Sequence, residues 1–119
     1  MKNEINRRHD AQGNLIEEGE YINDVLNGYL RIWNSQGMLL SDANFKNGKA
    51  HGLSRTWGEG GNLNCESQYE NGELHGHYRS WWENGTLKEE GIFKHGKRSG
   101  RYIWYNKDGT VWQITETED

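Results

Sequence analysis

The sequence is poor in apolar side chains, which make up 32% of its 119 residues, and this limits the core that it can bury. So low an apolar fraction is typical of disordered chains. Six tryptophans and six tyrosines argue against disorder, because disordered chains are poor in both residue types. A thin core is therefore expected, with stability that comes from the stacking of neighbouring structural units.

The sequence also has little cysteine, no long apolar run and only a small net charge. The lone Cys65 cannot form an internal disulfide, so a reducing compartment is expected. Residues 1–10 contain no apolar signal-peptide region, and no run of about 18 apolar residues occurs elsewhere. These absences predict a soluble, cytoplasmic protein without a membrane partner. The net charge of −4 lacks the positive field that captures phosphates, so no nucleic-acid partner is expected.

Glycine is abundant, and its positions recur at a fixed interval of 24 residues. The first series is Gly13, Gly37, Gly61, Gly85 and Gly109, the second is Gly28, Gly52, Gly76 and Gly100, and the third is Gly48, Gly72 and Gly96. Such a period predicts a repeat architecture, and the length predicts one domain, residues 1–119. Its repeats are expected at approximately residues 5–28, 29–52, 53–76, 77–100 and 101–115.

The local patterns predict strands, because a glycine in a helix interior costs roughly 1 kcal/mol against alanine. Asn47-Gly48 and Asn71-Gly72 indicate two-residue hairpin turns, in which both central residues take positive φ. The glycine four residues after each turn is expected to mark a bulge or a close backbone approach. The predicted fold is all-β: an elongated single antiparallel meander sheet of about ten strands, on the order of 45 Å long.

Large side chains recur at odd-numbered positions of the repeats, with small residues two positions before the Tyr/Phe column. The columns are Trp33, Trp57 and Trp81; Leu39, Leu63 and Leu87; Tyr21, Phe45, Tyr69 and Phe93; Arg31, Arg55 and Arg79; and the small residues Gly19, Ala43, Ser67 and Gly91. Because side chains alternate between the faces of a strand, we expect the odd-numbered columns to form one structural face. The even-numbered side chains would then be free for another role.

Two segments carry a family resemblance: Phe45 to Gly52, which reads F-K-N-G-K-A-H-G, and Tyr69 to Gly76, which reads Y-E-N-G-E-L-H-G. They resemble the MORN repeat in its bacterial variant form, and the resemblance covers roughly residues 8–114. Proteins of this kind include YwqK-like antitoxins, which are immunity proteins paired with secreted or contact-delivered bacterial toxins. The resemblance thus implies a protein-binding module with a cognate toxin as its partner, and it implies no catalytic residues.

Several aromatic side chains at even-numbered positions are not needed by the repeat pattern. They are Tyr78, Trp82, Tyr102, Trp104 and Trp112. Extra aromatic residues on a free face are typical of protein-binding hot spots, so we predict that they contact the partner. The alternative is that this face is covered by curling of the sheet or by a second copy in a homodimer. Glu66 and Glu90, from a repeated acidic column, would set the electrostatic fit; a merely solvated stripe is the other interpretation.

No constellation of side chains indicates catalysis. His51 and His75 occupy equivalent positions about 10 Å apart, and Cys65 has no fixed His or Asn partner. We therefore expect no enzymatic activity, catalytic residue, metal or cofactor. A second interpretation is a phage- or bacteria-encoded inhibitor or scaffold that binds another protein complex. Lipid binding is a third, and the lack of a Lys/Arg cluster weakens it.

Overall fold

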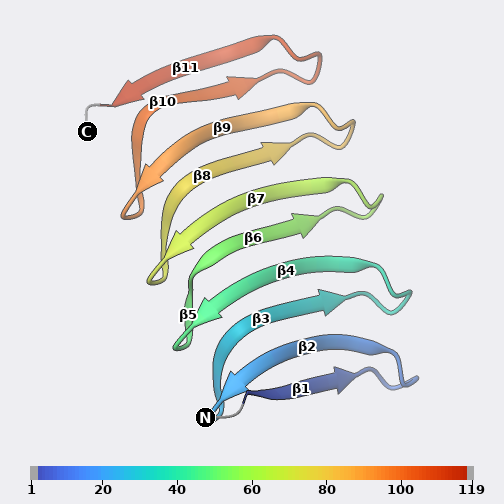
Figure 1. Ribbon diagram of the computed structural model, residues 1–119. Coiled ribbons are helices and arrows are strands. Elements are labelled where there is room, and N and C mark those ends of the chain that lie inside the picture. Colours follow the sequence, from blue (N-terminus) through green and yellow to red (C-terminus); the bar gives the residue numbers. More distant parts are fainter. Residues whose placement is uncertain (1–2, 118–119) are drawn as a thin grey trace.

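The computed structural model describes residues 3–117, which form one antiparallel sheet (Figure 1). Its strands are β1 (Glu4–His9), β2 (Leu15–Ile22), β3 (Val25–Trp33), β4 (Leu39–Lys46), β5 (Lys49–Ala50), β6 (Gly52–Trp57), β7 (Leu63–Glu70), β8 (Glu73–Trp81), β9 (Leu87–Lys94), β10 (Lys97–Tyr105) and β11 (Val111–Thr117). Each long strand pairs with the next in chain order, and the short β5 pairs with β4. The all-β meander predicted from the sequence is confirmed.

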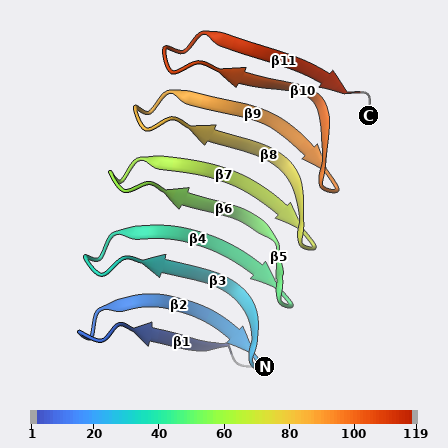
Figure 2. The same ribbon diagram turned by 180° about the vertical axis from the view of Figure 1, so that it is seen from behind.

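The sheet is a single layer that measures 44 × 32 × 15 Å along its principal axes, close to the expected length. Front and back views show that nothing else within residues 3–117 covers either face (Figures 1 and 2). β1 and β11 are the two edge strands and lie at opposite ends of the sheet. Among the strands of residues 3–117, each edge strand has a neighbour on one side only.

The tight turns at one end of the hairpins have the expected geometry. Asn47 and Gly48 have φ values of 52° and 82°, and Asn71 and Gly72 have 52° and 87°. Positive φ at both positions is the signature of the hairpin turn that Asn-Gly favours. The expected turns at these positions are therefore confirmed.

The glycine that follows each tight turn marks a bulge, as expected. The register between β7 and β8 shifts near Gly76, which has a φ of 114°. A Cβ at Gly76 would lie 2.3 Å from the side-chain oxygen Oε1 of Gln68. That same oxygen accepts a hydrogen bond of 3.0 Å from the backbone N–H of His77. The bulge thus needs glycine both for its φ and for the space that the Gln68 amide occupies.

One face of the sheet carries stacked rings, and we call it the ring face. It holds the Tyr/Phe column, the small residues two positions before it, and the side chains that lie across from those small residues on the next strand. The last group is Leu30, Ser54, Tyr78 and Tyr102. A Cβ added to Gly91 would lie 2.2 Å from a ring carbon of Tyr102, and one added to Gly19 would lie 3.1 Å from Leu30. The small residues therefore make room for the side chains opposite.

The other face carries a row of alternating charges, and we call it the charge-ladder face. The row crosses eight strands in the order Arg7, Glu18, Arg31, Asp42, Arg55, Glu66, Arg79 and Glu90. Nitrogen–oxygen distances are 2.7 Å for Arg7–Glu18 and 2.8 Å for Arg55–Glu66. The acidic column is therefore neutralised by the arginine column.

The expected division into odd-numbered and even-numbered faces is wrong. Arg31 lies opposite Asp42, so an odd-numbered residue shares its face with an even-numbered one on the next strand. Residues of opposite parity pair beyond both kinds of turn: the two-residue turn pairs Ile22 with Val25, and a bulge next to the 34–38 turn has the same result for Arg31 and Asp42. A register shift between Ile32 and Trp33 changes the parity again near the other turn. As a result, the Trp column lies on the side of the arginines and the Tyr/Phe column lies on the opposite face.

Burial is concentrated toward the C-terminal end of the sheet. Tyr102, with 2% of its surface exposed, is the one buried hydrophobic residue in the described part of the chain. The buried polar residues are Ser67, Ser80 and Ser99. The core is as thin as the composition predicts, and stability depends on contacts between neighbouring strands.

Candidate functional site

Three of the predicted contact residues form a ring cluster on the ring face. Phe93 makes edge contacts with Tyr78 and Tyr102 at centroid distances of 5.8 and 5.9 Å. Trp104 lies 4.6 Å from Tyr102, again between ring centroids. Such ring pairs are worth about 0.5–1.5 kcal/mol each beyond the area that they bury. The cluster therefore stabilises the last two repeats, and Gly91 is the residue that gives Tyr102 its space.

Tyr102 belongs to the interior of this cluster. The guanidinium of Arg98 covers its ring at 4.4 Å and that of Trp104 at 4.9 Å. Burial, together with a hydrogen bond from the Tyr102 hydroxyl to Glu89, raises the pKa of Tyr102 well above its ordinary value. With almost no exposed surface, Tyr102 supports the rings around it and does not offer a free contact surface. The expectation of a free even-numbered face fails here because Tyr102 shares its face with Phe93.

Trp82 lies at the β8–β9 turn and takes a place that an Asn holds in another repeat. At the equivalent Asn34, the side-chain oxygen accepts the N–H groups of Gln36 and Met38 and closes the turn. Trp82 instead donates its indole N–H to the carbonyl of Tyr105, 3.1 Å away. In this turn the Asn84 side chain accepts the N–H of Thr86, which is equivalent to Met38, and the Trp82 side chain contacts the next repeat instead.

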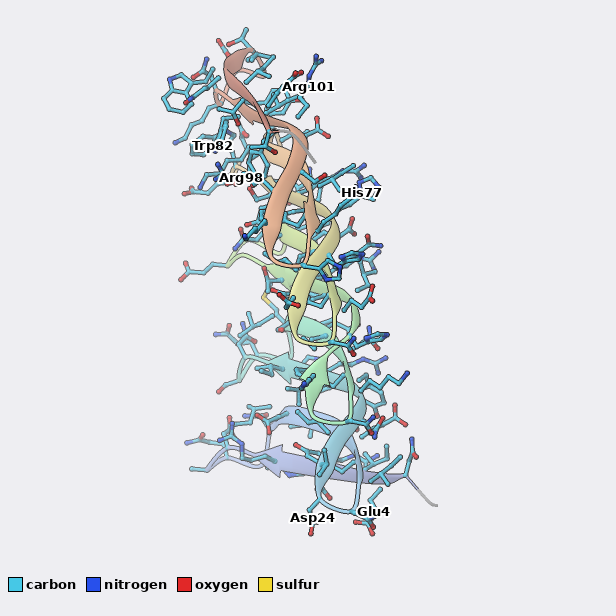
Figure 3. The ribbon with its side chains drawn as sticks, turned by 90° about the vertical axis from the view of Figure 1, so that its left-hand side faces the viewer. Glu4, Asp24, His77, Trp82, Arg98 and Arg101 are labelled. Carbon is cyan, nitrogen blue, oxygen red and sulfur yellow. The ribbon has the colours of Figure 1, made fainter. Side chains whose placement is uncertain are left out.

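Two lysines lie over the Trp82 ring. The Nζ atoms of Lys88 and Lys107 are 4.8 and 5.4 Å from its centroid. A hollow opens beside the ring and is lined in part by Gly58 and Gly60, whose turn carries little side-chain volume. In Figure 3, Trp82 and Arg98 lie on one side of the ribbon, and His77 and Arg101 lie on the other.

Trp112 is the most exposed of the predicted contact residues, with 65% of its surface accessible. It lies on the edge strand β11, next to Val111 and two residues from Ile114, which are 51% and 48% exposed. The repeat pattern has Glu or Asp at the position of Ile114 and Arg at that of Ile103, which pairs with it. The charge ladder therefore ends in two isoleucines at this edge.

Glu66 and Glu90 are already engaged within the sheet. Glu66 accepts a hydrogen bond of 2.8 Å from Arg55. Glu90 lies 4.0 Å from Arg79 and accepts a hydrogen bond from the hydroxyl of Tyr105. Their predicted role in partner recognition stays a prediction, and these internal partners would compete with it.

Sequence reasoning missed Val111, Ile114 and the cations over the rings. The column comparison contained a signal for Ile114, because an apolar residue replaces an acid there. Nothing in the spacing indicated which aromatic ring each cation would cover, since those contacts join different strands.

The remaining side chains considered for metal binding or nucleophilic chemistry are the histidines and Cys65. Within residues 3–117, no group of three or more His, Cys, Asp or Glu residues is placed to hold a metal ion. Burial raises the pKa of the Cys65 thiol, which keeps it protonated and unreactive at neutral pH. The rings of His75 and His95 are 4.8 Å apart, and each lies near a glutamate. In the same described range, no helix has the length and apolar character needed to cross a membrane.

Comparison with known proteins identifies one repeat. Residues 74–95 match a family profile described as a MORN repeat variant. The match runs from β8 through β9, so it covers one hairpin of the sheet. No curated protein matches the chain. The match supports a MORN-repeat protein, and its description mentions no toxin, antitoxin or bacterial source.

Proposed function

We propose that this chain is a non-enzymatic protein-binding module whose partner docks at the C-terminal end of the sheet. The observation that carries the proposal is the edge strand β11, which exposes Val111, Trp112 and Ile114 beside an unpaired backbone edge. End repeats of stacked proteins usually present a polar surface, because an apolar end promotes association. An apolar end with free backbone groups suits binding of a partner.

The physical basis of binding would be strand addition. Along an edge strand, alternate residues direct both N–H and C=O away from the sheet, so an extended segment can extend the ladder. Apolar side chains at the edge add burial, and Trp is the residue type most often found in binding hot spots. The neighbouring rings hold the strand in place, so little ordering entropy is lost on binding.

For the partner we propose a bacterial toxin that the chain neutralises by direct binding in the cytoplasm. The support is the resemblance to YwqK-like antitoxins, together with the repeat match at residues 74–95. An inhibitor or scaffold that binds another protein complex would use the same edge. A toxin gene adjacent to the gene for this chain would favour immunity.

The test compares the two edges of the sheet. The chain and two variants are used to capture partners from the native cell, and each captured protein is then purified for titration calorimetry. Ile114→Lys adds a charge to β11, and Ile5→Lys adds one to β1, where Ile5 is 39% exposed. We expect Ile114→Lys to weaken binding at least tenfold and Ile5→Lys to leave it unchanged.

Trp112→Ala should weaken binding by a similar factor, because it removes the largest exposed side chain at this edge. Circular dichroism serves as the control that each variant keeps its strands. If both β11 variants bind the purified partner as the parent chain does, the proposed surface is wrong.

A further inference from the structure

Two sets of cations in this chain differ in what lies beside them, although Arg31 of the first set also lies over the Tyr29 ring at 4.2 Å. The arginines of the charge ladder each lie opposite carboxylates on neighbouring strands, as Arg55 does with Glu66 at 2.8 Å. A second group lies over aromatic rings near the C-terminal end of the sheet and consists of Lys88, Arg98 and Lys107. Within residues 3–117, none of these three lies within ion-pair distance of a carboxylate.

The two environments have different electrostatic consequences. A carboxylate cancels the charge of its partner, whereas an aromatic ring attracts a cation through its quadrupole and leaves the net charge in place. Glu89, whose carboxylate accepts the hydroxyl of Tyr102, and Glu83, which lines the hollow beside Trp82 together with Lys88, lie in the same region, but within residues 3–117 neither forms an ion pair with one of the three cations. Within residues 3–117 the ring-bound cations therefore have no carboxylate partner at ion-pair distance, on a chain whose net charge is −4.

Arg98 lies on β10, Lys107 lies in the turn between β10 and β11, and Lys88 lies on β9, one strand further from the β11 edge. Lys107 is in the turn that leads into β11, and Lys88 shares the Trp82 ring with it. The guanidinium of Arg98 lies over Tyr102 and Trp104, which pair with Thr115 and Gln113 of β11. The carbonyl of Arg98 also accepts a hydrogen bond of 3.0 Å from the hydroxyl of Thr117. A segment laid along β11 would therefore run past Arg98 on the ring face and Lys107 at the preceding turn.

We propose that the segment bound at β11 is an extended, acidic stretch of polypeptide. This inference rests on the proposed function and names the chemistry of the partner. A polypeptide supplies the alternating N–H and C=O groups that an open strand edge pairs with, which nucleic acids and lipid headgroups lack. Carboxylates at alternate positions would face the ring-bound cations, while apolar residues between them would face Ile103 and Ile114 on the other side.

The experiment uses three fluorescent peptides as long as β11 that alternate valine with glutamate, glutamine or lysine, and it measures binding by anisotropy. We expect the glutamate peptide to bind most tightly and the lysine peptide most weakly. The preference for glutamate should shrink as salt is raised, because exposed charge pairs are screened. Replacing Lys88, Arg98 and Lys107 by Gln should cost about two- to five-fold for each residue, and at least tenfold together.

Two control variants separate a charge effect from damage to the fold. Arg98→Lys keeps the charge over the rings and should keep the preference for glutamate. Arg55→Gln removes a neutralised cation of the ladder and should leave all three affinities unchanged. The inference is overturned if the three peptides bind equally, or if anionic phospholipid vesicles or single-stranded DNA compete for the same cations more strongly than the glutamate peptide.

The same measurements distinguish a failure of this inference from a failure of the proposed function. If Ile114→Lys abolishes capture of the native partner while the glutamate peptide shows no preference, the edge is the binding site and the acidic chemistry is wrong. If Ile114→Lys leaves the partner bound, the proposed function itself fails.

Discussion

The two edge strands of this sheet expose different kinds of side chain, charged on β1 and apolar on β11. β1 presents Arg7 and Arg8, which pair with Glu18 and Glu17 on β2 at 2.7 and 3.2 Å. β11 presents Val111, Trp112 and Ile114, and its ion pair within residues 3–117 joins Glu116 to Arg101. Charged side chains on an edge strand discourage pairing with another chain, and apolar ones invite it. The β1 edge therefore disfavours pairing with another chain, whereas the β11 edge favours it.

The difference also bears on growth of the sheet by stacking of copies. β1 has the place in the repeat that β3 has one unit later, so a second copy added in register would set its Arg7 against Ile114. At the matching place inside the sheet, Arg31 meets Glu18. The missing acid leaves an arginine opposite an apolar side chain, and this disfavours an open head-to-tail filament.

The largest loss of stability is expected from a substitution at Tyr102, near the C-terminal end of the sheet. Tyr102→Ala removes the one buried ring of the described chain and should lower the free energy of unfolding by about 3–5 kcal/mol. Its equivalent near the other end is the half-buried Leu30, and Leu30→Ala should cost about 1–2 kcal/mol. Urea denaturation followed by tryptophan fluorescence measures both. Equal losses would mean that the two ends are supported alike.

The glycines beneath these two side chains provide a second comparison. Gly91→Ala would put a Cβ 2.2 Å from the Tyr102 ring and should cost about 1–3 kcal/mol, because the ring has to move. Gly19→Ala meets Leu30 at 3.1 Å, where a flexible side chain can shift, and should cost less than half as much. Thermal unfolding of the two variants tests this order. The reverse order would show that Tyr102 is free to adjust.

Alkaline pH should loosen the C-terminal end. Burial raises the pKa of both Tyr102 and Tyr78 above the ordinary value near 10. Folding favours the neutral hydroxyl, so this contribution is complete below about pH 10 and is lost as the pH rises toward the folded-state pKa. The urea midpoint should therefore fall between pH 9 and pH 11, and it should fall less in Tyr102→Phe. An equal fall in both proteins would assign the effect to other groups.

The smallest change in stability is expected at the charged edge. Arg7→Ile breaks one exposed ion pair and should cost less than about 1 kcal/mol. It also gives β1 an apolar edge like that of β11, so sedimentation velocity should show association that rises with concentration. Arg55→Ile makes the same exchange on the interior strand β6, which has no free edge, and should stay unassociated. Association of both variants would point to the face of the sheet and not to its edge.

Local residue patterns were sufficient to predict much of this fold. The 24-residue period, the Asn-Gly turns and the bulge glycines depend on the conformation that each short segment can adopt, and a segment such as Asn71-Gly72 carries its own φ preference. The strand order follows from the same signals, because a two-residue turn leaves no room for any neighbour but the next strand. These features were determined by the sequence alone.

The tertiary structure decided which columns share a face and which aromatic rings are covered. Face assignment depends on register across a hairpin and on the shift beside Trp33, which no single strand specifies. The burial of Tyr102 depends on Gly91 and Phe93 in the preceding strand and on Arg98 above its ring. Whether the charge of each cation is neutralised likewise depends on whether a carboxylate or a ring lies across from it. These are properties of pairs of strands, and only their arrangement in space determines them.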